Sequence, residues 1–149
     1  MRPSRLWTDE SGSASLEFVT VGMIMLLPLV YLVLAVSSIQ AGAFAAEGAA
    51  RQAARVFVQS PDAGAGQAGA QRALDFALAD NGVSAPASLA ISCQPRPREC
   101  LTRQGYVTVA VEVAVPLPLV PPVLLGDFPL AVPLRATATE QVSRFWGSG

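Results

Sequence analysis

An uncharged apolar run over residues 18–39 constrains this chain more than any other feature. As an α-helix the run is about 33 Å long, while the hydrocarbon core of a bilayer is about 30 Å thick. A soluble helix of this length normally has a polar face, whereas the hydroxyl side chains of Thr20, Ser37 and Ser38 are nearly all that this run offers. The sequence therefore predicts one membrane-spanning helix near the N-terminus.

Two features describe the shape and direction of this predicted span. Pro28 lies in its middle, and because proline removes a backbone donor and crowds the preceding turn, we expect a helix kink there. Arg2 and Arg5 precede the span, and no basic residue follows it until Arg51. The distribution predicts a single-pass protein of the cytoplasmic (inner) membrane, with its N-terminus in the cytoplasm and its C-terminal domain outside.

The junction between the hydrophilic leader and the span holds the candidate functional residues. Glu17 is the fifth residue after Gly12, and Phe18 follows it at the start of the apolar run. A carboxylate at the edge of a membrane helix is costly to bury and needs a partner. Cleavage after Gly12 would give Ser13 a free amine, which could pair with Glu17 of the next subunit in an assembly of packed helices.

This junction resembles the class III signal of type IV pilin-like proteins, in which a membrane aspartyl peptidase cuts after the glycine and the glutamate directs assembly. An aromatic residue after the glutamate is typical of the Flp/Tad branch. Residues 44–57, FAAEGAARQAARVF, are similar to a region of TadE-like pseudopilins, so the resemblance covers residues 11–57. It implies processing between Gly12 and Ser13. It also implies three partners besides the membrane: a prepilin-type peptidase, other pilin-like subunits and the Tad assembly machinery.

Helical patterns continue beyond the span. The Ala-rich residues 40–58 should extend the helix out of the membrane, with Glu47 placed to pair with Arg51 one turn later. Ser60 either follows the end of this helix or caps the start of the next one. Residues 70–80 predict a short second helix.

Two sequence details frame this second helix. Gly64, Gly66 and Gly69 predict a flexible stretch before it, and Leu74 and Leu78 share one of its faces. Asn-Gly at positions 81 and 82 is a good helix stop.

The apolar period then changes from helical to alternating. Residues 87–93, 106–115 and 130–142 are predicted strands, and the middle one alternates strictly between valine and other residues. We therefore expect an α+β fold: a long membrane-spanning helix, a short helix and a small antiparallel β-sheet.

The expected domain organisation has three parts. Residues 1–12 form the cytoplasmic leader, residues 13–59 the long helix, and residues 60–149 a small α+β domain outside the cytoplasm.

Two cysteines bracket the connection between the first two predicted strands. Cys93 and Cys100 are placed to close a hairpin, and disulfides persist outside the cytoplasm, so we expect a disulfide here. Two thiols in a chain without histidine are too few for a closed zinc site.

A second connection, residues 116–129, is apolar and rich in proline, so it is not expected to be a central strand. It is either a long hairpin loop packed on the domain or an exposed loop that contacts a membrane or a partner subunit.

Composition excludes several functional classes. All ten basic residues are arginine, the net charge is −1, and only 14% of residues are charged. A chain of this kind lacks the general basic surface that a nucleic-acid partner needs. Without histidine, a phosphate-binding glycine loop or a cluster of acids, the sequence predicts no catalytic residues, no metal and no cofactor. The protein is expected not to be an enzyme.

Together these features predict a TadE-like minor pseudopilin in the biogenesis of a Flp/Tad pilus or a related secretion system. Two alternatives remain. Residues 41–43 read Ala-Gly-Ala, so ordinary signal peptidase could release a secreted binding module that begins at Phe44. A signal-anchored envelope protein without any processing is the other alternative.

Overall fold

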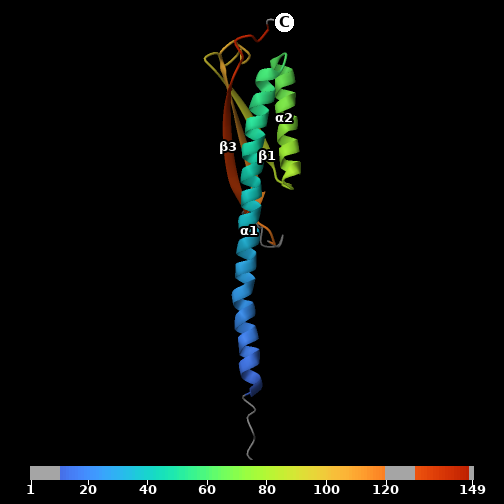
Figure 1. Ribbon diagram of the computed structural model, residues 1–149, viewed down its shortest axis with the longest axis vertical. Coiled ribbons are helices and arrows are strands. Elements are labelled where there is room, and N and C mark those ends of the chain that lie inside the picture. The colour runs from blue at the N-terminus through green and yellow to red at the C-terminus, as the bar shows by residue number, and fades with distance from the viewer. Residues whose placement is uncertain (1–10, 120–129, 148–149) are drawn as a thin grey trace, which may run out of the picture. The chain divides into compact units, whose positions relative to one another are not determined.

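A computed structural model describes the backbone of residues 11–119 and 130–147, and side chains from Ala14 onward within these ranges. The predicted α+β class is confirmed. Two helices, α1 (Ser11–Gln59) and α2 (Ala63–Asp80), precede three strands, β1 (Ala87–Gln94), β2 (Tyr106–Pro116) and β3 (Ala131–Gln141) (Figure 1). The strands form one antiparallel sheet in the order β1-β2-β3.

The chain divides into two compact units, residues 1–34 and residues 35–149. In the first unit every described residue from Ala14 to Leu34 is exposed. The second unit contains the rest of α1, together with α2 and the sheet. Residues 35–59, predicted as part of the long helix, therefore belong to the same compact unit as the domain that follows them.

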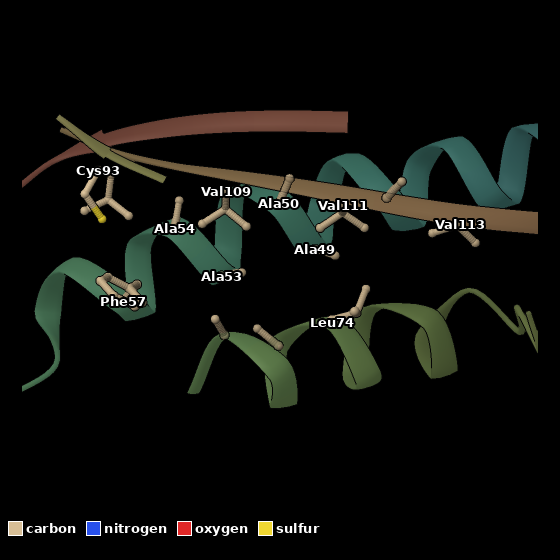
Figure 2. Packing of buried hydrophobic residues seen from close by; sticks show 14 of the residues in the cluster. Ala49, Ala50, Ala53, Ala54, Phe57, Leu74, Cys93, Val109, Val111 and Val113 are labelled. Atoms are coloured by element: carbon tan, nitrogen blue, oxygen red, sulfur yellow. The ribbon is translucent and has the colours of Figure 1, made fainter. Parts of the chain in front are cut away.

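The core of the second unit lies between the sheet and the two helices. On β2, alternate residues point to this core, which explains the strict valine alternation in the sequence; the buried members are Val107, Val109, Val111, Val113 and Val115. On α1, alanines one helical turn apart form the opposing face, ending at Phe57, with Ala45, Ala46, Ala49, Ala50, Ala53 and Ala54 buried. Figure 2 shows four of these alanines, from Ala49 to Ala54, beside Val109, Val111 and Val113, with Leu74 of α2 beneath them.

The predicted start of the second helix is wrong. Helix α2 begins at Ala63, seven residues before the predicted position, and its N-cap is Asp62, whose carboxylate accepts a hydrogen bond of 2.8 Å from the Ala65 N–H. Ser60 is not the cap, because its hydroxyl donates instead to the Val56 carbonyl at 2.8 Å within the last turn of α1. The first alternative for Ser60 is thus the correct one.

The glycines at the start of α2 are also not a flexible stretch. Gly66 and Gly69 are buried in the helix, and a Cβ atom at Gly66 would lie 2.9 Å from the Phe57 ring. A Cβ at Gly69 would lie 2.6 Å from the Val56 side chain. Helix α2 therefore approaches α1 closely at positions without a side chain, and the burial that results offsets the low helix propensity of glycine.

The strands agree with the predicted ranges to within one residue at each end. On β3, Leu134, Ala136 and Ala138 are partly buried, and the residues between them are exposed, as predicted. The apolar connection over residues 116–129 is described only as far as Leu119, so the prediction for residues 120–129 lies outside the described residues.

Candidate functional site

The predicted processing and assembly residues lie in the first turns of α1. Gly12 and Ser13 have helical backbone, although the prediction placed Gly12 in a leader before the helix. The Ser13 side chain and residues 1–10 lie outside the described part. Glu17 lies four residues after Ser13, which is about one helical turn along α1. Its side chain is exposed, and it makes no ion pair with any residue that the structure describes.

The surface that follows Glu17 is apolar and open. Phe18 is 80% exposed, and the large apolar side chains that follow it, through Leu34, are all exposed as well. The hydroxyl of Thr20 donates to the Leu16 carbonyl at 2.7 Å, so the helix itself satisfies this polar group. Over Ala14–Gln59, helix α1 is long enough and apolar enough to cross a membrane, judged by its length and composition.

The helix continues without interruption through Pro28. Proline is tolerated in membrane helices, where neighbouring groups satisfy the freed carbonyl. The predicted kink at this residue stays a prediction.

Past Ile39, the exposed side of α1 becomes charged. Arg51 donates to Glu47 across one turn at 3.1 Å, which confirms the predicted pair. Both side chains are more than half exposed, so this pair contributes at most a few tenths of a kcal/mol to the helix. Phe44, on the same part of α1, is 69% exposed.

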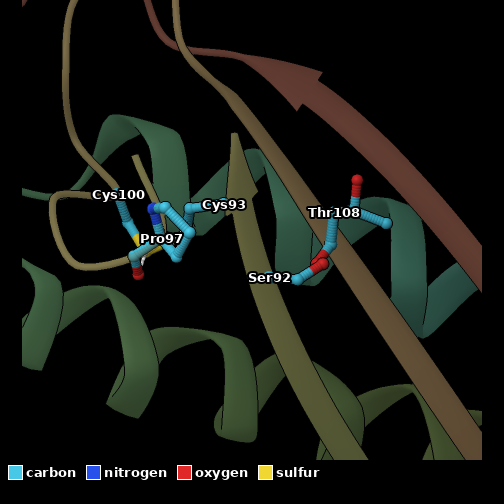
Figure 3. Close-up of a disulfide and its surroundings, with 5 residues drawn as sticks. All are labelled: Ser92, Cys93, Pro97, Cys100 and Thr108. Carbon is cyan, nitrogen blue, oxygen red and sulfur yellow. Dashed lines mark hydrogen bonds between the residues drawn. A yellow bond between two sulfur atoms is a disulfide. The ribbon is translucent and has the colours of Figure 1, made fainter. Parts of the chain in front are cut away.

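Cys93 and Cys100 form a disulfide in the structure, with their Cα atoms 5.1 Å apart (Figure 3). Cys93 lies at the end of β1 and is buried in the core, while Cys100 lies in the connection to β2 and packs against that core. The bond therefore fastens the β1–β2 connection to the body of the domain. Pro97 lies beside the disulfide in the closed loop.

A second group of residues was not anticipated from the sequence. The β1–β2 connection, the segment after β3 and the turn between α1 and α2 meet at one end of the second unit (Figure 1). Arg103 Nε donates to the Trp146 carbonyl at 3.0 Å, and the Trp146 indole N–H donates to the Ser60 carbonyl at 3.2 Å. The same two segments are joined by backbone hydrogen bonds. The Gln104 N–H donates to the Val142 carbonyl at 3.1 Å, and the Val142 N–H donates to the Gly105 carbonyl at 2.8 Å.

Two of these residues, Arg103 and Trp146, line a shallow hollow, here named the arginine hollow. It is lined by Arg96, Leu101, Thr102, Arg103, Trp146 and Gly147. The signal for it in the sequence is the alternation of proline and arginine in the Cys93–Cys100 loop. The position of Trp146 beside this loop follows from the three-dimensional pairing of β2 with β3.

Among the described residues, no group of three or more histidine, cysteine, aspartate or glutamate side chains is arranged to hold a metal ion. The candidate sites are therefore the start of α1, with its exposed apolar surface, and the arginine hollow of the second unit.

No family model, no curated protein and no solved structure matches this chain.

Proposed function

We propose that this protein is a TadE-like minor pseudopilin that acts in the biogenesis of a Flp/Tad-type pilus or a related secretion system. In this proposal a prepilin-type peptidase cuts between Gly12 and Ser13 on the cytoplasmic side. The apolar part of α1 then anchors the protein in the inner membrane and packs against the helices of other pilin-like subunits. The compact unit that begins at Ala35 lies outside the cytoplasm.

The observation that carries the proposal is the environment of Glu17. This carboxylate lies at the start of the exposed apolar part of α1, residues 14–34, and has no ion-pair partner in the described part of the chain. Placing an unpaired carboxylate among packed membrane helices is unfavourable by several kcal/mol. A free amine on Ser13 of a neighbouring subunit would neutralise it, so Glu17 would favour one register between subunits.

The disulfide supports the same topology. Disulfides persist in oxidising compartments and are rare in the cytoplasm, and the Cys93–Cys100 bond lies in the unit that follows the span. The N-terminal arginines and this bond independently favour the same orientation.

The first experiment determines the N-terminus of the protein purified from its native membrane, by intact mass and terminal sequencing. A start at Ser13 is expected, and Gly12→Val should leave the chain uncut because the resemblance places the cut directly after this glycine. A start at Phe44 would mean a secreted module cut by signal peptidase. An intact N-terminus would mean an unprocessed anchored protein, and either of these results would refute the proposal.

The second experiment tests the assembly role of Glu17. Glu17→Gln should leave membrane insertion intact but strongly reduce recovery of the protein in crosslinked complexes with other pilin-like subunits. The matched control is Glu47→Gln, which removes one exposed carboxylate from the same helix. Equal recovery of the two variants would remove the proposed role of Glu17.

A further inference from the structure

We propose that the arginine hollow binds an acidic polysaccharide, through a carboxylate on a sugar ring. The hollow lies outside the machinery proposed for processing and assembly, because all of its lining residues belong to the second unit. The choice of a polysaccharide of the cell envelope rests on the proposed topology, whereas the chemistry of the hollow rests on its own residues.

The two segments that form the hollow are rich in positive charge, and two of their arginines, Arg96 and Arg103, line it. Residues 94–105 and 142–147 contain four arginines and one acid, although the whole chain has a net charge of −1. Glu99, the one acid, lies 3.4 Å from Arg96, and both side chains are about two-thirds exposed, so this pair is weak and can be displaced by a ligand. The other three arginines, Arg98, Arg103 and Arg144, have no ion-pair partner among the described residues.

The hydrogen bond made by Arg103 leaves donors of this side chain available for a carboxylate ligand. Arg103 uses its Nε for the Trp146 carbonyl, which fixes the plane of the guanidinium and leaves its two terminal amino groups as donors. A guanidinium offers parallel N–H groups that match the two oxygens of a carboxylate. Arg96 lies in the wall of the same hollow and supplies a second positive charge.

The aromatic wall distinguishes a sugar from a simple anion. The Trp146 indole is held by its N–H bond to Ser60, so its ring is fixed without a ligand. Trp146 is partly buried against the core, and the part of its indole that lines the hollow offers an apolar surface to the C–H face of a pyranose, while Thr102 adds a hydroxyl that can bond to sugar hydroxyls. Because hydrogen bonds hold Arg103 and Trp146 in place before a ligand binds, association costs little ordering entropy.

Single-stranded nucleic acid also combines anionic and ring groups, but it fits this surface less well. Such binding normally uses a basic groove along the backbone and several exposed aromatic faces for successive bases. The other aromatic residue here, Phe145, has the Arg144 guanidinium 4.8 Å from its ring centroid, so one ring face is already covered. One available ring beside a small group of arginines suits a single acidic sugar unit of a chain.

The experiment measures binding of the full chain in detergent micelles to immobilised polygalacturonate, with neutral dextran as the control polymer. We expect saturable binding to polygalacturonate at about 150 mM salt, which is physiological ionic strength, and no binding to dextran. Arg96→Gln should weaken this binding about tenfold, because it removes a charge-assisted hydrogen bond. The matched control, Arg72→Gln, removes an exposed arginine on α2 outside the hollow and should change affinity less than about twofold.

Two further variants separate a site from general electrostatic attraction. Arg103→Lys keeps the charge but loses the bidentate geometry, so it should also weaken binding severalfold. Trp146→Phe keeps an aromatic ring but loses the bond to Ser60, and it should reduce affinity while the thermal unfolding transition is retained. Absence of binding to polygalacturonate would overturn the proposal, as would equal losses in Arg96→Gln and Arg72→Gln. Tighter binding to single-stranded DNA through the same residues would also overturn it.

This assay is independent of processing and assembly. Binding is measured on purified protein, so an uncut N-terminus would refute the proposed function and leave the sugar-binding result unaffected. Failure to bind the polymer would likewise leave the result of N-terminal sequencing unaffected.

Discussion

Adding a single methyl group at Gly66 tests whether the close approach of α2 to α1 holds the second unit together. A Cβ atom there would lie 2.9, 3.1 and 3.2 Å from three carbons of the Phe57 ring. Real Cβ atoms essentially never come within 3.0 Å of another heavy atom. The ring is only 2% exposed and is packed within the core, so it has little room to move away.

Two effects of opposite sign set the expected magnitude for Gly66→Ala. Alanine is more favourable than glycine inside a helix by about 1 kcal/mol. Forcing an extra methyl group into a packed core costs about 1–3 kcal/mol. The variant should therefore lie between unchanged and about 2 kcal/mol less stable than the unmodified chain.

The matched control is Gly48→Ala on α1. A Cβ at this exposed helical position would meet nothing within 4 Å, so only the propensity term acts and the variant should gain about 1 kcal/mol. The propensity terms cancel in the difference between the two variants, which should be about 1–3 kcal/mol. Urea unfolding of both proteins in the same detergent, followed by circular dichroism, measures this difference.

A second change distinguishes the contact with the ring from a general defect in α2. In the double variant Phe57→Leu/Gly66→Ala, the smaller side chain makes room for the methyl group. The destabilisation by the double variant should therefore be smaller than the sum of the two single effects. Equal stability of Gly66→Ala and Gly48→Ala would refute the packing described here.

Three further results are expected. Replacing both Cys93 and Cys100 with alanine should lower the free energy of unfolding by about 2–3 kcal/mol, through lost restriction of the unfolded chain, and thiol labelling of the unreduced native protein should fail at both. Asp62→Ala removes the N-cap of α2 and should cost about 1 kcal/mol in the same urea assay, whereas no change would mean that the cap is not formed. Arg135→Gln breaks the exposed pair with Glu112, whose atoms lie 3.5 Å apart, and should alter stability by less than about 1 kcal/mol; a larger loss would show that the pair is shielded from solvent.

Much of the fold was predictable because its patterns are local. The valine alternation over residues 106–115 identified both the strand and its buried face, since side chains in a strand alternate between the two faces of the sheet. The uncharged run over residues 18–39 indicated a helix of membrane-spanning length from hydropathy and length alone. The cysteines were expected to pair because they bracket a short connection between two strands.

The first seven residues of α2 were missed because their local signals point the other way. Three glycines within six residues disfavour a helix in an isolated segment. The contact of Gly66 with Phe57 is made between residues on different helices, and its energy outweighs the local preference. The alanines of α1 raise the same difficulty, because alanine is only weakly hydrophobic and its sequence pattern does not show whether a strand or another subunit will cover it.

The two candidate sites differ in the same way. The start of α1 is a continuous stretch of sequence, so Gly12, Ser13, Glu17 and Phe18 could be proposed from spacing, hydropathy and the resemblance to the pilin-like signal. The arginine hollow is built from residues 96–103 and 146–147, and it exists only because the β2–β3 pairing brings the C-terminal segment to the β1–β2 connection. By itself the sequence determined a helix long and apolar enough to span a membrane, the strands and the candidate processing site, because these depend on properties of neighbouring residues. Only the tertiary structure decided the extent of α2, the alanine face of the core and the hollow, because contacts between distant segments supply the energy that forms them.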